Sequence, residues 1–164
     1  MAFQGTEAKL RMSSWEDHDT CVTAWLARSE GLGTAQRCQF FEQALSVLWH
    51  RAHRTLADVT LMAIVERVLH NAAEKVPLFG ALRVETNGFL CDGLRERSRT
   101  ADPQLLEEGM RFVLTEYLTV LGSLTADVLT PALHAELLNM TLSAGDGKHQ
   151  SEGKSKRAEG QRDS

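Results

Sequence analysis

The strongest constraint in this sequence is a series of apolar residues that recur at every third or fourth position in its C-terminal half. The series follows Asp102 and Pro103, which are typical of an N-cap residue and the first residue of a helix. Successive members are separated by four, three, four, three and four residues: Leu106, Met110, Val113, Tyr117, Val120 and Leu124. Side chains at this spacing lie along one face of an α-helix. The sequence therefore predicts a long helix here, and we expect its apolar face to belong to the core.

The same periodicity predicts two helices in the N-terminal third of the chain. Ser13 and Glu16 have the spacing of a capping box, so a helix over about residues 14–29 is expected to follow them. Thr34 is a candidate N-cap for the second helix. The inward face of the first helix is predicted to consist of Cys21, Val22, Trp25 and Leu26. That of the second consists of Cys38, Phe41, Leu45, Leu48 and Ala52.

Two further helices are predicted, one between Thr55 and Pro77 and one that starts at Thr130. Thr55 and Asp58 repeat the capping pattern more weakly, which indicates either a bend or a new helix that ends before Pro77. Thr130 and Pro131 begin the last helix. The inward residues expected on these two helices are Met62, Val65, Leu69 and Ala72, and then Leu133, Leu137, Leu138, Met140 and Leu142.

The pattern changes between Pro77 and Pro103. Short apolar alternation flanks Asn87-Gly88, the dipeptide that best accepts the positive φ angles of a tight hairpin turn. Each arm is short, so an irregular loop is nearly as good an interpretation as a hairpin. We expect one or the other as an insertion near residues 78–94.

The last segment, residues 143–164, mixes Gly, Ser and charges of both signs. With almost no apolar side chains, it cannot offset the conformational entropy lost on ordering, and we expect a disordered tail. The fold predicted for residues 1–142 is a single all-α domain, a bundle of about five helices with a short irregular or hairpin insertion.

Composition and the absence of known motifs disfavour several functional classes. The 164 residues carry a formal net charge of -4, which gives no basic footprint for DNA or RNA. Cys21, Cys38 and Cys91 are odd in number and far apart, so buried free thiols in a reducing compartment are expected. No apolar run approaches the roughly 18 residues that span a bilayer, and we expect a cytoplasmic protein. No phosphate-binding glycine loop or nucleophile elbow occurs, so we expect no enzymatic activity.

The preferred hypothesis is a helical interaction or sensory module that acts through helix packing as a homodimer. Phe40 and Val47 form a second, weaker apolar stripe on the back of the predicted second helix, next to His50. An apolar stripe outside the core face is typical of a surface that binds a partner or a second copy. Phe40, Val47 and His50 are therefore the predicted partner-binding residues.

A ligand-binding sensor is the first alternative. Its pocket would lie among the helices and take a small molecule or a metal, with no particular cofactor indicated. The aromatic residues predicted to line it are Trp25, Trp49, Phe79, Phe89 and Tyr117.

The second alternative is histidine phosphotransfer. His53 would be the phosphoacceptor, because Arg51 and Arg54 flank it and can balance phosphate charge. A metal site formed by His50, His53, Glu66 and His70 is disfavoured, because a helical hairpin bent near residue 55 would leave the second pair of ligands turns away from the first. His70 lies between Glu66 and Glu74 at helical spacing and can pair with either carboxylate.

Two other histidines receive structural interpretations. His18 belongs to an Asp-His-Asp cluster in the first turn of its helix, where acidic residues favour the helix dipole. His134 is interpreted as the flank of a packing seam in the last helix.

Overall fold

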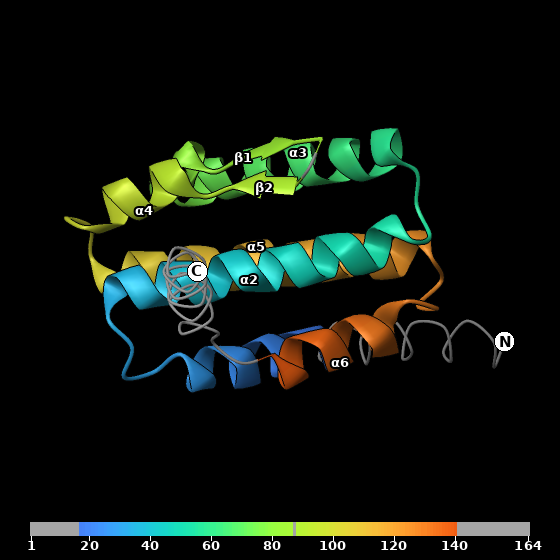
Figure 1. Cartoon of the computed structure of the whole chain (residues 1–164), viewed down its shortest axis with the longest axis horizontal. Coiled ribbons are helices and arrows are strands. Elements are labelled where there is room, and N and C mark those ends of the chain that lie inside the picture. Colours follow the sequence, from blue (N-terminus) through green and yellow to red (C-terminus); the bar gives the residue numbers. More distant parts are fainter. Residues whose placement is uncertain (1–16, 87, 141–164) are drawn as a thin grey trace, which may run out of the picture.

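Two long helices, α2 (Thr34–His53) and α5 (Pro103–Leu124), lie in the middle of the molecule. The computed structural model describes residues 17–86 and 88–140. On one side of α2 and α5 lie α3 (Asp58–Lys75), a β-hairpin and α4 (Asp92–Ser98), and on the other lie the first helix (residues 17–28) and α6 (Thr130–Asn139), as Figure 1 shows. The chain therefore forms three layers, and both middle helices are covered on two sides.

The prediction of an all-α bundle with a short insertion is confirmed. The described residues contain six α-helices, of which the seven-residue α4 is the one that the sequence did not predict. The predicted capping box at Ser13 and Glu16 and the predicted tail over residues 143–164 lie outside the described part of the chain. No helix within residues 17–86 and 88–140 is long and apolar enough to cross a membrane.

Three of the predicted helix starts can be compared with the structure. Asp102 is the N-cap of α5, as predicted, and its carboxylate accepts from the backbone N–H of Gln104 at 2.9 Å. The prediction for Thr34 is wrong by one residue, because Thr34 is already helical and Gly33 is the N-cap. Between the two alternatives at residues 55–58, the structure has a new helix, since α2 ends at His53 and α3 starts at Asp58.

The insertion contains a hairpin, the first of the two predicted alternatives. A 3-10 turn, η1 (Pro77–Ala81), leads into strand β1 (Arg83–Glu85), which pairs antiparallel with β2 (Gly88–Leu90). Gly88 has a φ of 129°, a conformation that side chains with a Cβ rarely adopt. The hairpin is fixed to the bundle by Phe89, whose ring meets Trp49 of α2 at 6.0 Å and Tyr117 of α5 at 5.9 Å, both edge-on.

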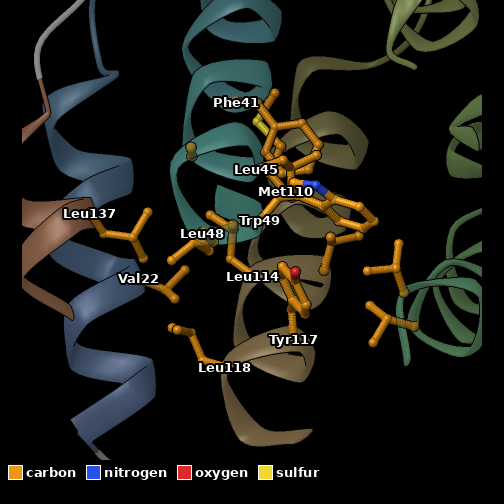
Figure 2. Packing of buried hydrophobic residues seen from close by; sticks show 14 of the residues in the cluster. Val22, Phe41, Leu45, Leu48, Trp49, Met110, Leu114, Tyr117, Leu118 and Leu137 are labelled. Carbon is orange, nitrogen blue, oxygen red and sulfur yellow. The ribbon is translucent and has the colours of Figure 1, made fainter. Parts of the chain in front are cut away.

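The core joins all three layers. Figure 2 shows Leu48 of α2 and Leu118 of α5 packing toward Val22 and Leu137, which come from the first helix and α6. Along the predicted seam of α5, Leu106, Met110, Val113 and Tyr117 are buried and Val120 is half-buried. Leu124, the last residue of α5, is 57% exposed, so the seam is shorter than predicted.

Candidate functional site

The most unusual polar feature of the described structure is a pair of histidines in contact between the first helix and α6. Nδ1 of His18 lies 2.9 Å from Nε2 of His134, and the two rings meet edge-on with centroids 5.1 Å apart. One imidazole nitrogen must donate its N–H while the other accepts, so the contact holds a single shared proton. It joins residues that are 116 positions apart in the sequence.

Burial is the main influence on the protonation state of the two histidines. His18 is 2% exposed, and desolvation lowers its pKa below 6.5, with a further lowering from His134. Burial also lowers the pKa of His134. Asp127 and Asp17 act in the opposite direction on both rings, but desolvation outweighs them. Both imidazoles are therefore neutral near pH 7.

The α5–α6 turn closes over His18. Thr130 donates its hydroxyl to the Asp127 carboxylate at 2.9 Å, and the backbone N–H of Asp127 donates to the carbonyl of Gly122 at 2.7 Å. A Cβ on Gly122 would lie 2.8 Å from an Asp127 carboxylate oxygen and 3.4 Å from Nε2 of His18. Glycine at position 122 is therefore what allows the carboxylate and the imidazole to share this space.

The thiol beside the pair is buried and keeps its proton near neutral pH. Cys21 lies one turn along the first helix from His18, and its sulfur is 3.9 Å from the carbonyl oxygen of His134. Burial raises the pKa of Cys21 to about 11, so the thiol stays protonated and poorly reactive. Cys38 and Cys91 are also buried free thiols whose pKa values are raised by desolvation.

His50, His53 and His70 lie apart from this pair and have separate partners. His50 is exposed, and its Nδ1 is 2.7 Å from the carbonyl oxygen of Ser46 in its own helix. His70 is exposed on α3, 3.7 Å from Glu74. Among the described residues, no group of three or more His, Cys, Asp or Glu side chains is arranged to hold a metal ion.

The predicted phosphoacceptor, His53, is at the end of α2. Its side chain is about half exposed and its Nε2 is paired with the carboxylate of Asp58 at the start of α3. That carboxylate would repel a phosphoryl group on the same nitrogen. Phosphotransfer at His53 stays a hypothesis.

The predicted partner-binding stripe is only partly on the surface. The expectation that Phe40 points outward is wrong: its side chain is 3% exposed and stacks on Trp25 with ring centroids 4.9 Å apart. The reason is that α2 lies in the middle layer, where the first helix covers the side that the sequence left free. Val47 is half-buried, and His50 borders a hollow of about 120 Å³ next to Phe89.

The five aromatic residues predicted to line a ligand pocket belong to two packed clusters. Trp25 and Phe79 both approach Phe41, with ring centroids 6.3 Å and 6.0 Å from it, and all three are fully buried. Trp49, Phe89 and Tyr117 form the second cluster around the hairpin (Figure 2 shows Trp49 and Tyr117). The Tyr117 hydroxyl is buried and has no hydrogen-bond partner among the described residues.

The histidine pair was not predicted from the sequence, although the position of His18 could have been. His18 precedes Cys21, Val22 and Trp25 by three, four and seven residues, so helical periodicity places it on the inward face. The interpretation of His18 as part of a charged first-turn cluster did not identify this buried position. Nothing in the local sequence could have indicated His134 as its partner.

No family model matches the chain, and no match is found among curated proteins or solved structures.

Proposed function

We propose that this chain is a non-enzymatic helical sensory module that acts through helix packing and responds to protons at the His18–His134 contact. The observation that carries the proposal is the contact between two imidazole nitrogens at 2.9 Å, with one of the two rings almost completely buried. A buried histidine pair that gains charge on acidification is a recognised basis for pH-dependent switching.

The response follows from the charges around the pair. The first proton that the neutral pair binds places one cation in a buried position and leaves an N–H that can still donate across the contact, and a second proton places two cations within hydrogen-bond distance. The titratable groups that face the pair are Asp17 on the first helix, Asp127 in the α5–α6 turn and the protonated thiol of Cys21. The two carboxylates reduce the repulsion without removing it. Acidification is therefore expected to loosen the first helix and α6 from each other.

The first test is the pH dependence of stability. Both folded-state pKa values lie below 6.5, so the unfolded chain binds more protons than the folded chain once the pH falls below about 6.5. The stability contributed by the neutral pair is present above that pH and is lost as the pH falls toward the lowered pKa values. Urea unfolding at about pH 7.5 and about pH 5 should show a larger loss for wild type than for His18→Gln or His134→Gln.

The matched control is His50→Gln, which removes an exposed histidine from α2. Its loss of stability on acidification should equal that of wild type. Two variants of the pair are used because the buried His18→Gln change can itself weaken folding, whereas His134 is half-buried. Equal acid sensitivity in wild type and both pair variants would reject the proton-sensing role.

We further propose that the working form is a homodimer joined near the same end of the bundle. Figure 1 shows the α2–α3 connection and the α5–α6 turn at one end of the molecule. Val59, Leu124 and Val128 lie on the elements that meet there and are 81%, 57% and 76% exposed. Large apolar side chains so exposed are typical of an interaction surface. This surface adjoins the turn that closes over His18, so a change at the histidine pair can reach it.

A ligand-binding sensor is supported by a separate observation. A buried donor without a partner costs about 1–3 kcal/mol, and the Tyr117 hydroxyl is such a group. Burial also raises the pKa of Tyr117, so the hydroxyl remains a donor. A ligand acceptor that reached it beside Phe89 would relieve that cost. Tyr117→Phe should abolish the binding of such a ligand, measured by native mass spectrometry of purified protein, while leaving the fold at least as stable.

A further inference from the structure

A half-open groove of about 220 Å³ runs along the outward side of α5. Asp19 of the first helix and Lys75 of α3 border it on the two flanks, and α5 forms its floor. The groove is separate from the proposed dimer surface at the end of the bundle. Its lining combines charged groups of both signs with one aromatic ring.

On the floor of the groove, the aromatic ring of Phe112 lies between two glutamate side chains. Glu108, Phe112 and Glu116 are spaced four residues apart on α5, so they follow one another along the same face. The ammonium nitrogen of Lys75 lies 5.1 Å from the centre of the Phe112 ring. This is within the range of a cation–π contact, so the ring already holds an alkylammonium group of the chain itself.

The charges in the groove do not balance. Arg111 is engaged with Asp19 at 3.4 Å and donates to the Thr23 hydroxyl at 2.8 Å. Within the described residues, neither Glu108 nor Glu116 has an ion-pair partner, so two carboxylates face the single ammonium of Lys75. One additional positive charge would make this set neutral.

A buried hydroxyl in the same groove lacks a partner. Thr115 is 8% exposed and lines the groove, and its hydroxyl oxygen makes no hydrogen bond in the described part of the chain. A threonine in a helix commonly bonds to the carbonyl one turn earlier, as Thr119 does to Thr115 at 2.7 Å. The Thr115 hydroxyl is thus left able to accept a hydrogen bond from an ammonium group.

We propose that this groove binds a small organic cation, a primary ammonium carried on an apolar body. The apolar part lies against Phe112, the charge is balanced by Glu108 and Glu116, and an N–H of the ammonium donates to the Thr115 hydroxyl. Lys75 occupies the ring in the free protein and swings outward when the ligand binds. Neither histidine of the pair lines the groove, so the groove provides a second input to the module.

The test compares three probes of similar shape and different charge by isothermal titration calorimetry on the full chain. Phenylethylamine is the cation, phenylacetate the anion and phenylalanine the zwitterion. We expect phenylethylamine to bind most tightly. Lys75→Met should tighten its binding, because the substitution removes the competing ammonium and keeps the alkyl chain. Tighter binding of phenylacetate, weaker binding of phenylethylamine to Lys75→Met, or no binding of any probe would overturn the proposal.

Substitutions in the floor test the individual contacts. Phe112→Leu keeps an apolar side chain but removes the ring, and should weaken phenylethylamine binding roughly three- to thirty-fold, the range of a cation–π contact. Thr115→Val should weaken the primary amine but not its trimethylammonium analogue, which has no N–H to donate. Glu116→Gln should also weaken binding, whereas Glu74→Gln, the same change at an exposed position of α3 outside the groove, should not. Equal effects of the two glutamate substitutions would place the cation elsewhere.

Discussion

At the scale of single residues, backbone strain is concentrated in the α5–α6 turn. Ala126 and Asp127 have φ angles of 51° and 62°, in the left-handed region that L-residues generally avoid. This conformation costs roughly 1–2 kcal/mol for an ordinary residue, and aspartate tolerates it better than alanine does. The hydrogen bonds of Asp127 to Thr130 and Gly122 hold the turn in place despite that cost. Strain next to the histidine pair is consistent with a turn that changes when the pair is charged.

Ala126→Gly should therefore stabilise the protein. Glycine adopts a positive φ without a Cβ clash, and the gain, reduced by the greater freedom of the unfolded chain, is about 0.5–1 kcal/mol. Urea unfolding near neutral pH measures it. The matched control is Ala135→Gly at an exposed position inside α6, which should cost up to about 1 kcal/mol. A loss of stability in both variants would show that residue 126 is not strained.

Sequence reasoning failed at Phe40 and at His18 for different reasons. Helical periodicity predicts which direction a side chain faces, but not how many neighbouring elements cover the helix. Phe40 was assigned to the surface because Phe41 and Leu45 already supplied one buried face, yet α2 is covered on two sides. His18 was grouped with Asp17 and Asp19 as a charged cluster in the first helical turn, although its spacing from Cys21 and Trp25 places it inward.

At the scale of elements, α5 packs against the insertion through one glycine. Gly109 lies under the ring of Phe79 in η1, and a Cβ at this position would lie 2.0 Å from a ring carbon. Phe79 is itself fully buried and packs edge-on against Phe41 of α2, so the ring has little room to move. The close approach of α5 and η1 therefore depends on the absence of a side chain at residue 109.

Gly109→Ala should destabilise the protein by about 3 kcal/mol, the upper part of the range for overpacked cores. The helix propensity of alanine works in the opposite direction and recovers up to about 1 kcal/mol. Gly80→Ala is the control, because the nearest atom to its added Cβ is 3.8 Å away, an ordinary contact. Thermal and urea unfolding of both variants measure the difference. Equal stabilities would mean that Phe79 yields easily and that the contact does not fix η1.

Element starts and lengths explain which parts of the secondary structure were predictable. Asp102 was identified because its side chain supplies the cap, whereas Gly33 has no side chain by which a cap could be recognised. The hairpin was predictable from Asn87-Gly88, but its competition with a loop could not be decided from arms of three residues each. Helix α4 was missed because seven residues make about two turns, too few for a periodic pattern.

At the scale of the whole molecule, the number and order of the long helices were predictable, and their layering was not. Each amphipathic helix shows which face it buries, but several arrangements of five such helices bury the same faces. The choice among them depends on specific contacts between distant segments, such as Gly109 with Phe79 and His18 with His134. For this reason the candidate site, which forms only where the first helix meets α6, could not be derived from either segment alone.

The last prediction concerns the proposed homodimer. Light scattering at neutral pH should give about twice the chain mass of 18.2 kDa. The double variant Leu124→Ser, Val128→Ser should give the mass of one chain, because it removes two exposed apolar side chains without touching the core. Leu105→Ser, at the other end of α5 and also exposed, is the matched control and should remain dimeric.

Other outcomes would place the interface elsewhere or exclude it. If Val47→Ser dissociates the dimer and the end-of-bundle variant does not, the interface is the exposed part of the stripe predicted from the sequence, next to His50. A wild-type mass of one chain would exclude the homodimer altogether.

If the dimer forms through the end of the bundle, lowering the pH to about 5 should weaken it in wild type more than in His134→Gln, because the histidine pair lies beneath the turn that carries Val128. That difference would connect proton binding at the buried pair to association of the module.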